Sequence, residues 1–297
     1  MKFLATVLLC VLPFVGAARP AAAEILDARG KVLAIEHADD GHFHIVHANG
    51  QRDDVVPSML LFGGDRFEVD GNAVVVARVD GERRTFSRVT PRSDLTVTRR
   101  HTQSFAAVEE RYVSALRMLI ADGRNEQITY LAVRSKGPVF NADPLAPSGD
   151  QFLPANEDHI VLLWRGGATR VLMEKGDGRT VIGDSGATDW VRVAIPAEAD
   201  PIKLQLAASE AAPEWVVHRQ PGAPSASWDK ATGADGTPRR LVRAIWLLKD
   251  GPPTWRLFAL TELADLSASG YFPADELWRA AQQGVLKVEL DKMPSRP

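Results

Sequence analysis

The fold of the N-terminal part of this chain is decided by residues 59–89, MLLFGGDRFEVDGNAVVVARVDGERRTFSRV. Two turn pairs, Asp70-Gly71 and Asp80-Gly81, divide this stretch into short runs rich in valine and phenylalanine. Asp-Gly pairs favour hairpin turns, and β-branched and aromatic residues favour strands. We therefore expect strands at 66–69, 73–79 and 82–89.

The same alternation of turns and short runs extends over residues 24–98. Asn49-Gly50 and Gly63-Gly64-Asp65 are further turn signals, so that a turn recurs roughly every ten residues. Two more short runs, 30–36 and 43–48, have the composition of strands. This pattern is typical of an all-β unit.

Several stretches of this region together resemble the FecR-like periplasmic domain over about residues 25–98: Gly30-Lys-Val32, the Asn49-Gly50 hairpin, residues 59–69, Ala73–Ala77 and Asp80-Gly81. The resemblance implies a small β-solenoid-like or sandwiched sheet in which Leu60 and Phe67 face inward and Gly64-Asp65 forms a tight turn. It also implies a link to envelope signalling, where the regulator has a cytoplasmic arm and a membrane helix. The present sequence is expected to have neither, so a signal would have to pass through a partner.

Residues 105–120 change to a helical period. The apolar face of this stretch is formed by Phe105, Val108, Tyr112, Ala115, Leu116 and Leu119. That spacing predicts an amphipathic helix capped by Ser104. A strand at 126–134 would complete a first domain of residues 24–135, and the proline-rich stretch 136–155 predicts a linker.

The second β region covers residues 156–220. Its short apolar runs predict six strands, which we place at 159–164, 169–174, 179–182, 190–195, 202–207 and 214–219. Short strands with glycine-rich turns favour an immunoglobulin-like sandwich, with Trp164 in its core. Residues 221–237 are rich in Pro, Ala, Gly and Ser and predict a second linker.

The C-terminal segment, residues 238–297, is predicted to be helical. Thr237-Pro238 can start a first helix, Asp250-Gly-Pro-Pro253 ends it, and two more helices follow, ending near Ser269 and before Gly284. The last two resemble a single tetratricopeptide-like hairpin. A stack of such repeats needs about three units to bury a core, so we expect this hairpin to pack on its neighbours.

The predicted fold class is thus mainly β with α. It comprises a FecR-like β domain, an immunoglobulin-like β-sandwich and a C-terminal helical segment. At 297 residues, the chain is long enough for each domain to bury a core of its own.

Residues 1–23 predict a secretory signal peptide. Lys2 precedes an apolar run over 3–18, and Ala21-Ala22-Ala23 forms a small-residue cleavage site. The run is shorter than the roughly twenty residues of a transmembrane helix. We therefore expect a periplasmic or secreted chain without a transmembrane segment after cleavage. The only cysteine, Cys10, lies in the signal, which excludes thiol chemistry in the mature chain.

The charge of the chain argues against nucleic acid as a partner. Without residues 1–23, lysine plus arginine falls from 35 to 33 against 38 acidic residues, which gives a net charge of −5. Nucleic-acid binders usually carry a positive excess. Residues 82–100 are an exception, with six arginines against two acids. The partner-binding candidates in this patch, for an envelope protein or an anionic polymer, are Arg83, Arg84, Arg88, Arg99 and Arg100.

The densest group of possible metal ligands lies at residues 36–47. His42 and His44 share one face of a predicted strand, whereas His47 points to the other face. Zinc needs three or four ligands, so this pair would need a carboxylate from the Asp39-Asp40 turn. His42 and His44 are therefore metal candidates, with a solvent-exposed strand face as the alternative.

No catalytic constellation stands out. Gly183-Asp-Ser-Gly186 matches the segment around the nucleophile of chymotrypsin-like proteases, but Ala187 replaces the glycine of that family, and we expect a β-turn. We predict a non-enzymatic binding or scaffolding protein of the bacterial envelope, with a role as an accessory to envelope signalling. The alternatives are an envelope hydrolase acting through carboxylates that no motif identifies, and a weak periplasmic metal-binding protein. The sequence indicates no cofactor and no particular oligomeric state.

Overall fold

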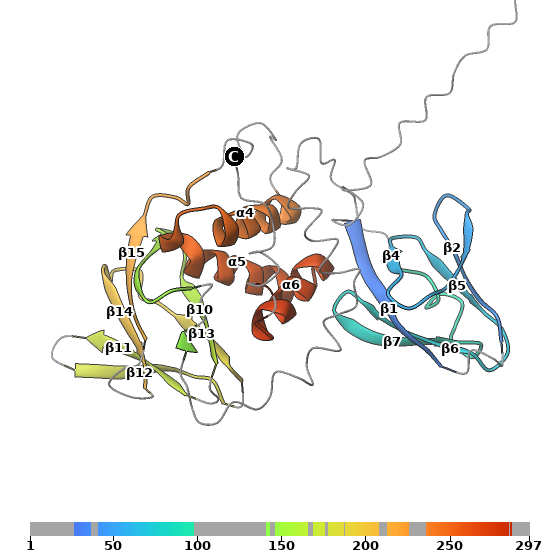
Figure 1. The fold of residues 1–297 in the computed structure, drawn as a ribbon, viewed down its shortest axis with the longest axis horizontal. Coiled ribbons are helices and arrows are strands. Elements are labelled where there is room, and N and C mark those ends of the chain that lie inside the picture. The colour runs from blue at the N-terminus through green and yellow to red at the C-terminus, as the bar shows by residue number, and fades with distance from the viewer. Residues whose placement is uncertain are drawn as a thin grey trace, which may run out of the picture.

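The computed structural model describes residues 27–36, 41–97, 141–142, 146–165, 169–175, 178–186, 188–207, 213–225, 236–284 and 286. Within these residues the chain is mainly β, with several antiparallel sheets followed by three α-helices (Figure 1). This is the fold class that the sequence predicts. The predicted signal peptide 1–23, the helix at 105–120 and the strand at 126–134 lie outside the described residues.

Seven antiparallel strands form the N-terminal unit as two sheets, ordered β4-β1-β6-β7 and β3-β2-β5. Their bounds are β1 Ala28–Glu36, β2 Phe43–Val46, β3 Arg52–Asp54, β4 Leu60–Phe62, β5 Arg66–Val69, β6 Val74–Val79 and β7 Glu82–Ser87. The strands predicted for this region are confirmed. The sequence pattern missed β3 and β4, which are only three residues long each.

These two sheets share one hydrophobic core. Phe67 on β5 and Phe86 on β7 stack with their ring centroids 4.3 Å apart, and Ile45 and Leu61 are fully buried beside them. Phe67 therefore faces inward, as predicted. The prediction for Leu60 is wrong, because successive side chains of a strand point to opposite faces and Leu61 fills the core instead. Leu60 packs against the C-terminal part of the molecule.

Two glycine turns of this unit have the backbone conformation that their residues favour. Asp80 and Gly81 both have positive φ angles, 53° and 83°, as a type I′ hairpin turn requires. Gly64 has a φ angle of 95°, and Asp65 N donates to Phe62 O at 3.1 Å, which confirms the predicted tight turn.

Eight strands form the second β region, in two sheets ordered β13-β10-β8 and β12-β11-β14-β15-β9. Their bounds are β8 Asn141–Ala142, β9 Gly149–Pro154, β10 His159–Arg165, β11 Arg170–Lys175, β12 Gly178–Asp184, β13 Trp190–Ala194, β14 Ile202–Leu206 and β15 Glu214–Gln220. The six strands predicted from the apolar runs are confirmed. Trp164 on β10 is fully buried, as predicted for a core residue.

Strand β9 corrects the prediction of a linker over residues 136–155, which is wrong for residues 149–154. This strand pairs in parallel with β15 over its whole length. Its polar residues and flanking prolines resemble a linker, yet Gln151 is buried with both ends of its amide paired. Its Oε1 accepts from Leu257 N at 3.1 Å, and its Nε2 donates to Pro147 O at 3.2 Å.

The helical segment comprises α4 Thr237–Lys249, a 3₁₀ turn η4 Pro253–Trp255, α5 Arg256–Ala268 and α6 Phe272–Gln282. These elements lie close to the predicted bounds. Helix α5 is buried around nearly its whole circumference, which is typical of a helix at the centre of a domain. Gly270, with a φ angle of 76°, makes the turn from α5 to α6.

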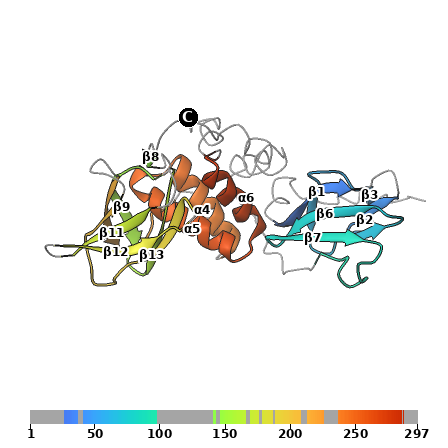
Figure 2. The same ribbon diagram turned by 90° about the horizontal axis from the view of Figure 1, so that it is seen from below.

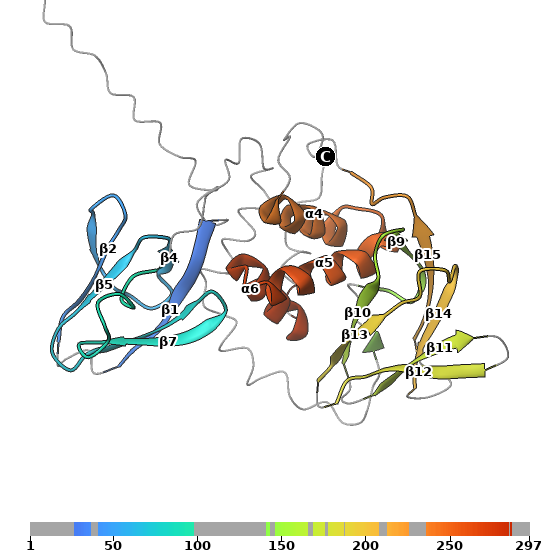
Figure 3. The ribbon, with the colours of Figure 1, turned by 180° about the vertical axis from the view of Figure 1, so that it is seen from behind.

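The helices fill the space between the two sets of strands, as Figures 1 and 3 show. One hydrophobic cluster includes side chains of β9 to β15 and of all three helices. The strands before the predicted linker at residues 221–237 and the helices after it thus share one hydrophobic core. Figure 2, turned by 90°, shows α6 on the side of the helical layer that faces the N-terminal unit. There Ala28 belongs to this cluster, and Leu60 and Phe62 pack against it.

Candidate functional site

A row of three cations crosses the first sheet of the N-terminal unit. In the register of the strands, Lys31 on β1 lies opposite Arg78 on β6, and Arg78 lies opposite Arg83 on β7. Like charges that lie directly opposite each other destabilise a sheet. The row therefore favours anionic groups on this face.

Glu276 of α6 pairs with both inner cations of this row. Its Oε2 accepts from Lys31 Nζ at 2.6 Å, and its Oε1 accepts from Arg78 Nη1 at 3.2 Å. The side chains of Lys31 and Glu276 are only 4% and 3% exposed. Because a buried charge without its partner is costly, this ion pair favours one particular docking of β1 on α6.

Asp275 adds a second carboxylate to the same helix end. Its Oδ2 accepts from Arg279 Nη2 at 2.5 Å, and its Oδ1 accepts from Ser267 Oγ at 3.3 Å. Burial raises the pKa of the Asp275 carboxyl above its ordinary value, although the Arg279 guanidinium opposes this rise. The N-terminal sheet and α6 thus meet through a network of largely buried charges.

The predicted partner-binding arginines continue this row at the edge of the sheet. Among the described strands β7 is an edge strand, and its Arg83 and Arg84 are exposed, as is Arg88 just beyond it. Arg84 Nη2 lies 3.1 Å from Glu82 Oε2 of the same strand. Arg99 and Arg100 lie outside the described residues.

The predicted metal-binding histidines lie at the start of β2. His42 is exposed just before the strand, and His44 Nδ1 lies 2.8 Å from Asp54 Oδ1 on β3. The Asp39-Asp40 turn, the expected third ligand, falls outside the described residues. His47 points elsewhere, with its ring nitrogens 3.0 Å from Asp65 Oδ1 and 3.2 Å from Asp53 Oδ2. Within the described ranges, His42 and His44 belong to no cluster of three converging ligands.

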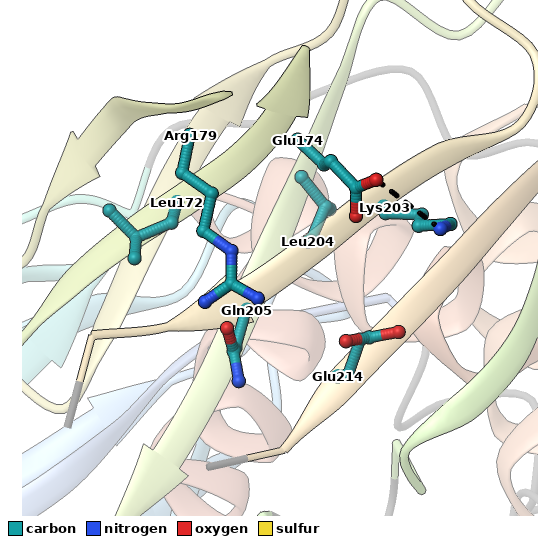
Figure 4. Close-up of a pocket in the computed structure, with 7 residues that line it drawn as sticks. All are labelled: Leu172, Glu174, Arg179, Lys203, Leu204, Gln205 and Glu214. Carbon is teal, nitrogen blue, oxygen red and sulfur yellow. Dashed lines mark hydrogen bonds and ion pairs between the residues drawn. The ribbon is translucent and has the colours of Figure 1, made fainter. Parts of the chain in front are cut away.

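A shallow depression lies on the outer face of the five-stranded sheet (Figure 4). Its empty space is about 190 Å³ including open solvent, and its charged residues are Glu174, Arg179, Lys203 and Glu214. Typical ligand pockets measure about 300–1,000 Å³. Lys203 Nζ donates to Glu174 Oε1 at 3.4 Å, which engages one of the two carboxylates.

A second charged cluster joins β10, β13 and α5. His159 stands at its centre: Nδ1 lies 2.7 Å from Asp158 Oδ1 and 3.3 Å from Glu157 Oε1, and Nε2 lies 3.1 Å from both oxygens of Asp265. Arg192 of β13 pairs with Asp265 Oδ1, an oxygen that also faces His159 Nε2. The cluster brings together groups from three separate parts of the chain.

The protonation of this cluster follows from its burial and its close contacts. Burial raises the pKa of the Glu157 carboxyl above its ordinary value. Burial alone would lower the pKa of His159, but hydrogen bonds to Asp158 and Asp265 outweigh it and raise that pKa. The hydrogen bond to His159 lowers the pKa of the exposed Asp158 carboxyl.

The prediction of a turn at Gly183-Asp-Ser-Gly186 is confirmed only for its second half: Gly183 and Asp184 end β12, and the turn begins at Ser185. Thr188 N donates to Ser185 O at 3.0 Å, and Gly186 has a φ angle of 58°. Ser185 is buried, and its Oγ accepts from Thr169 N at 3.0 Å. This hydroxyl therefore has a structural role in connecting the turn to the chain before β11.

Sequence reasoning missed both charged clusters. His159 and Asp265 are 106 residues apart, and Lys31 and Glu276 are 245 residues apart, so no local motif contains either pair. The one local signal was the spacing of Glu157 and His159, since residues two apart in an extended chain point to the same side.

Comparison with protein-family models, with curated proteins and with solved structures finds no match to this chain. No helix of the described residues is long and apolar enough to cross a bilayer.

Proposed function

We propose that this chain is an exported, non-enzymatic binding protein of the bacterial envelope that holds an acidic partner at the edge of its first sheet. The apolar leader sequence supports export, and the FecR-like pattern of residues 25–98 supports a place in the envelope. In this proposal the partner is an envelope protein or an anionic polymer, and it contacts the β7 edge.

The observation that carries this proposal is the row Lys31, Arg78 and Arg83. Helix α6 already provides one acidic side chain, Glu276, for the two inner members of the row. Among the described residues, no carboxylate forms an ion pair with the outer member, Arg83. An acidic segment placed along β7 would extend the same pairing outward, and complementary charge of this kind also speeds association.

The neighbouring charges strengthen this surface. Residues 82–100 carry an excess of four positive charges, whereas the chain as a whole is slightly acidic. A local field of one sign raises the concentration of oppositely charged partners near it. Edge strands also offer unpaired backbone groups, so that an extended partner segment can add main-chain hydrogen bonds to the ion pairs.

A charge-reversal experiment tests the proposal. The purified chain and its Arg83→Glu/Arg84→Glu variant are immobilised and exposed to envelope extract and, separately, to polyglutamate as a defined acidic probe. A matched variant, Arg170→Glu/Arg179→Glu, reverses two exposed arginines on β11 and β12 of the other unit. Treating the extract with protease beforehand distinguishes a protein partner from a polymer.

We expect the original chain and the matched variant to retain a partner that the Arg83→Glu/Arg84→Glu variant loses. Binding should also weaken as salt is added, because exposed charges are screened. Recovery of nothing above background, or equal recovery by all three chains, would contradict the proposal.

A further inference from the structure

The cluster around His159 is not used by the proposed binding surface, and its chemistry is different. We propose that Glu157, His159 and Asp265 form a binding site for a divalent transition-metal cation such as Zn²⁺. The three side chains come from the loop before β10, from the first residue of β10 and from the last turns of α5.

The distances within the cluster suit such an ion. One ligand atom from each of the three residues lies within 4.8 Å of the other two. Ligands of tetrahedral zinc, at about 2.0 Å from the metal, are about 3.3 Å from each other. His159 Nδ1 is 3.3 Å from Glu157 Oε1, whereas Nε2, on the other side of the ring, is 3.1 Å from Asp265 Oδ1. An ion bound to one of these nitrogens therefore requires the carboxylate beside the other nitrogen to rotate toward it, over a separation of no more than 4.8 Å.

The charge of the cluster also suits a cation. Glu157, Asp158 and Asp265 bring three carboxylates together around His159, and the Arg192 guanidinium pairs with Asp265. A histidine bound to a metal is neutral, so the occupied group has three carboxylates against one guanidinium, an excess of negative charge that a divalent cation would balance. A histidine nitrogen beside two carboxylates is a donor set for zinc and similar ions, whereas calcium and magnesium favour oxygen ligands alone.

The three ligands are only partly buried, so a bound ion could exchange with ions in solution. Glu157, His159 and Asp265 are 19%, 17% and 22% exposed, which shields an ion from most water but leaves a path to it. Three protein ligands leave a fourth position of a tetrahedral ion for a water molecule. The site is thus half-open rather than closed.

The surrounding structure holds the ligands in place before an ion binds. Thr261 Oγ1 accepts from Val161 N at 3.0 Å and donates to Leu257 O at 3.0 Å, which fixes β10 against α5. Val161 is two residues beyond His159, and Thr261 is one helical turn before Asp265. This anchor sets the distance between the histidine and the aspartate.

Substitution of Arg192 distinguishes a metal site from an ion-pair cluster that has only a structural role. The Arg192 guanidinium competes with a metal ion for the Asp265 carboxylate. Removing the charge of Arg192 should therefore raise the affinity for metal, although it removes one ion pair from the cluster. A cluster that serves only to join α5 to the sheet would gain no affinity for metal from this change.

Isothermal titration calorimetry of the purified chain with zinc chloride tests the site. We expect one saturable site, an affinity at least about 10-fold lower in His159→Ala and in Asp265→Asn, and a higher affinity in Arg192→Gln. A 10-fold loss is what removal of even a hydrogen-bond partner of a metal ligand causes. The matched controls are His218→Ala, which removes a histidine paired with the single carboxylate Asp150, and the double variant His42→Ala/His44→Ala. Both should bind zinc as the original chain does.

Circular dichroism of each variant shows whether it is folded. If His159→Ala fails to fold, Asp265→Asn, which keeps the side-chain size, and Arg192→Gln still decide the question. Absence of saturable binding in the original chain would overturn the proposal. So would unchanged binding in a folded ligand variant, or no gain in affinity in Arg192→Gln.

Discussion

Replacing Glu276 with Gln should be among the most destabilising single changes on the surface between α6 and the N-terminal unit. The substitution keeps the shape of the side chain and removes the negative charge that faces Lys31 Nζ at 2.6 Å and Arg78 Nη1 at 3.2 Å. Lys31 would then remain buried opposite a neutral amide. A buried cation without its counter-charge is the costly case, because water cannot replace the missing anion.

The size of the effect follows from the exposure of the partners. Breaking a buried pair by removing one partner costs about 3–5 kcal/mol. Lys31 and Glu276 are only 4% and 3% exposed, but Arg78 is 21% exposed and regains some hydration. The amide can still accept a hydrogen bond from Lys31, so we expect a loss of about 3 kcal/mol in the free energy of unfolding, at the lower end of that range.

Urea unfolding, followed by tryptophan fluorescence and by circular dichroism, measures this loss. Trp278 lies on α6 itself and reports on the part of the molecule that is changed. The matched control is Glu174→Gln, the same substitution in the exposed pair with Lys203, where we expect about 0–1 kcal/mol. Two probes are needed because a protein with two units need not unfold in a single step.

A double-mutant cycle with Lys31→Met separates the ion pair from other effects of the substitution. Once Lys31 is apolar, Glu276→Gln should cost less than it does alone, with a coupling of at least about 1.5 kcal/mol, as measured for close charge pairs. If Glu276→Gln lowers the free energy of unfolding no more than Glu174→Gln does, or if the cycle shows no coupling, the buried ion pair does not stabilise the contact between β1 and α6.

Three further predictions concern acid stability, core packing and backbone approach. Because burial raises the pKa of Asp275 in the folded state, the folded chain holds that proton more tightly than the unfolded chain, so stability is lost as pH rises through the raised pKa. The stability of Asp275→Asn relative to the original chain should therefore increase between about pH 4 and pH 7 in urea unfolding, and a flat difference would contradict this. Leu61→Ala, at a fully buried core position, should cost about 2–5 kcal/mol in the same assay, and a loss under about 1 kcal/mol would mean that Leu61 is not a core residue. Gly30→Ala would place a Cβ 2.0 Å from Arg78 O and should lower the melting temperature strongly, whereas Gly178→Ala, with open space around it, should leave the melting temperature nearly unchanged.

The sequence predicted most elements of this fold, because their signals are local. Asp-Gly pairs end strands through their own backbone preferences, and the positive φ angles of Asp80 and Gly81 agree with that prediction. The three helices were equally predictable, since prolines at the first positions of α4 and α6 and the Gly-Pro-Pro stop after α4 act within one turn of the chain. The exposure of Arg83 and Arg84 followed from their charge alone.

The tertiary structure decided what depends on partners distant in sequence. Residues 149–154 lack a strong strand signal and become β9 because β15 offers them a parallel edge. In the same way, packing against α6 and α5 determined that Lys31 meets Glu276 and that His159 meets Asp265. The sequence by itself thus established the elements and their exposed charges. Which charges are buried together depends on side chains that only packing brings within a few ångströms of each other, and a local pattern carries no information about that distance.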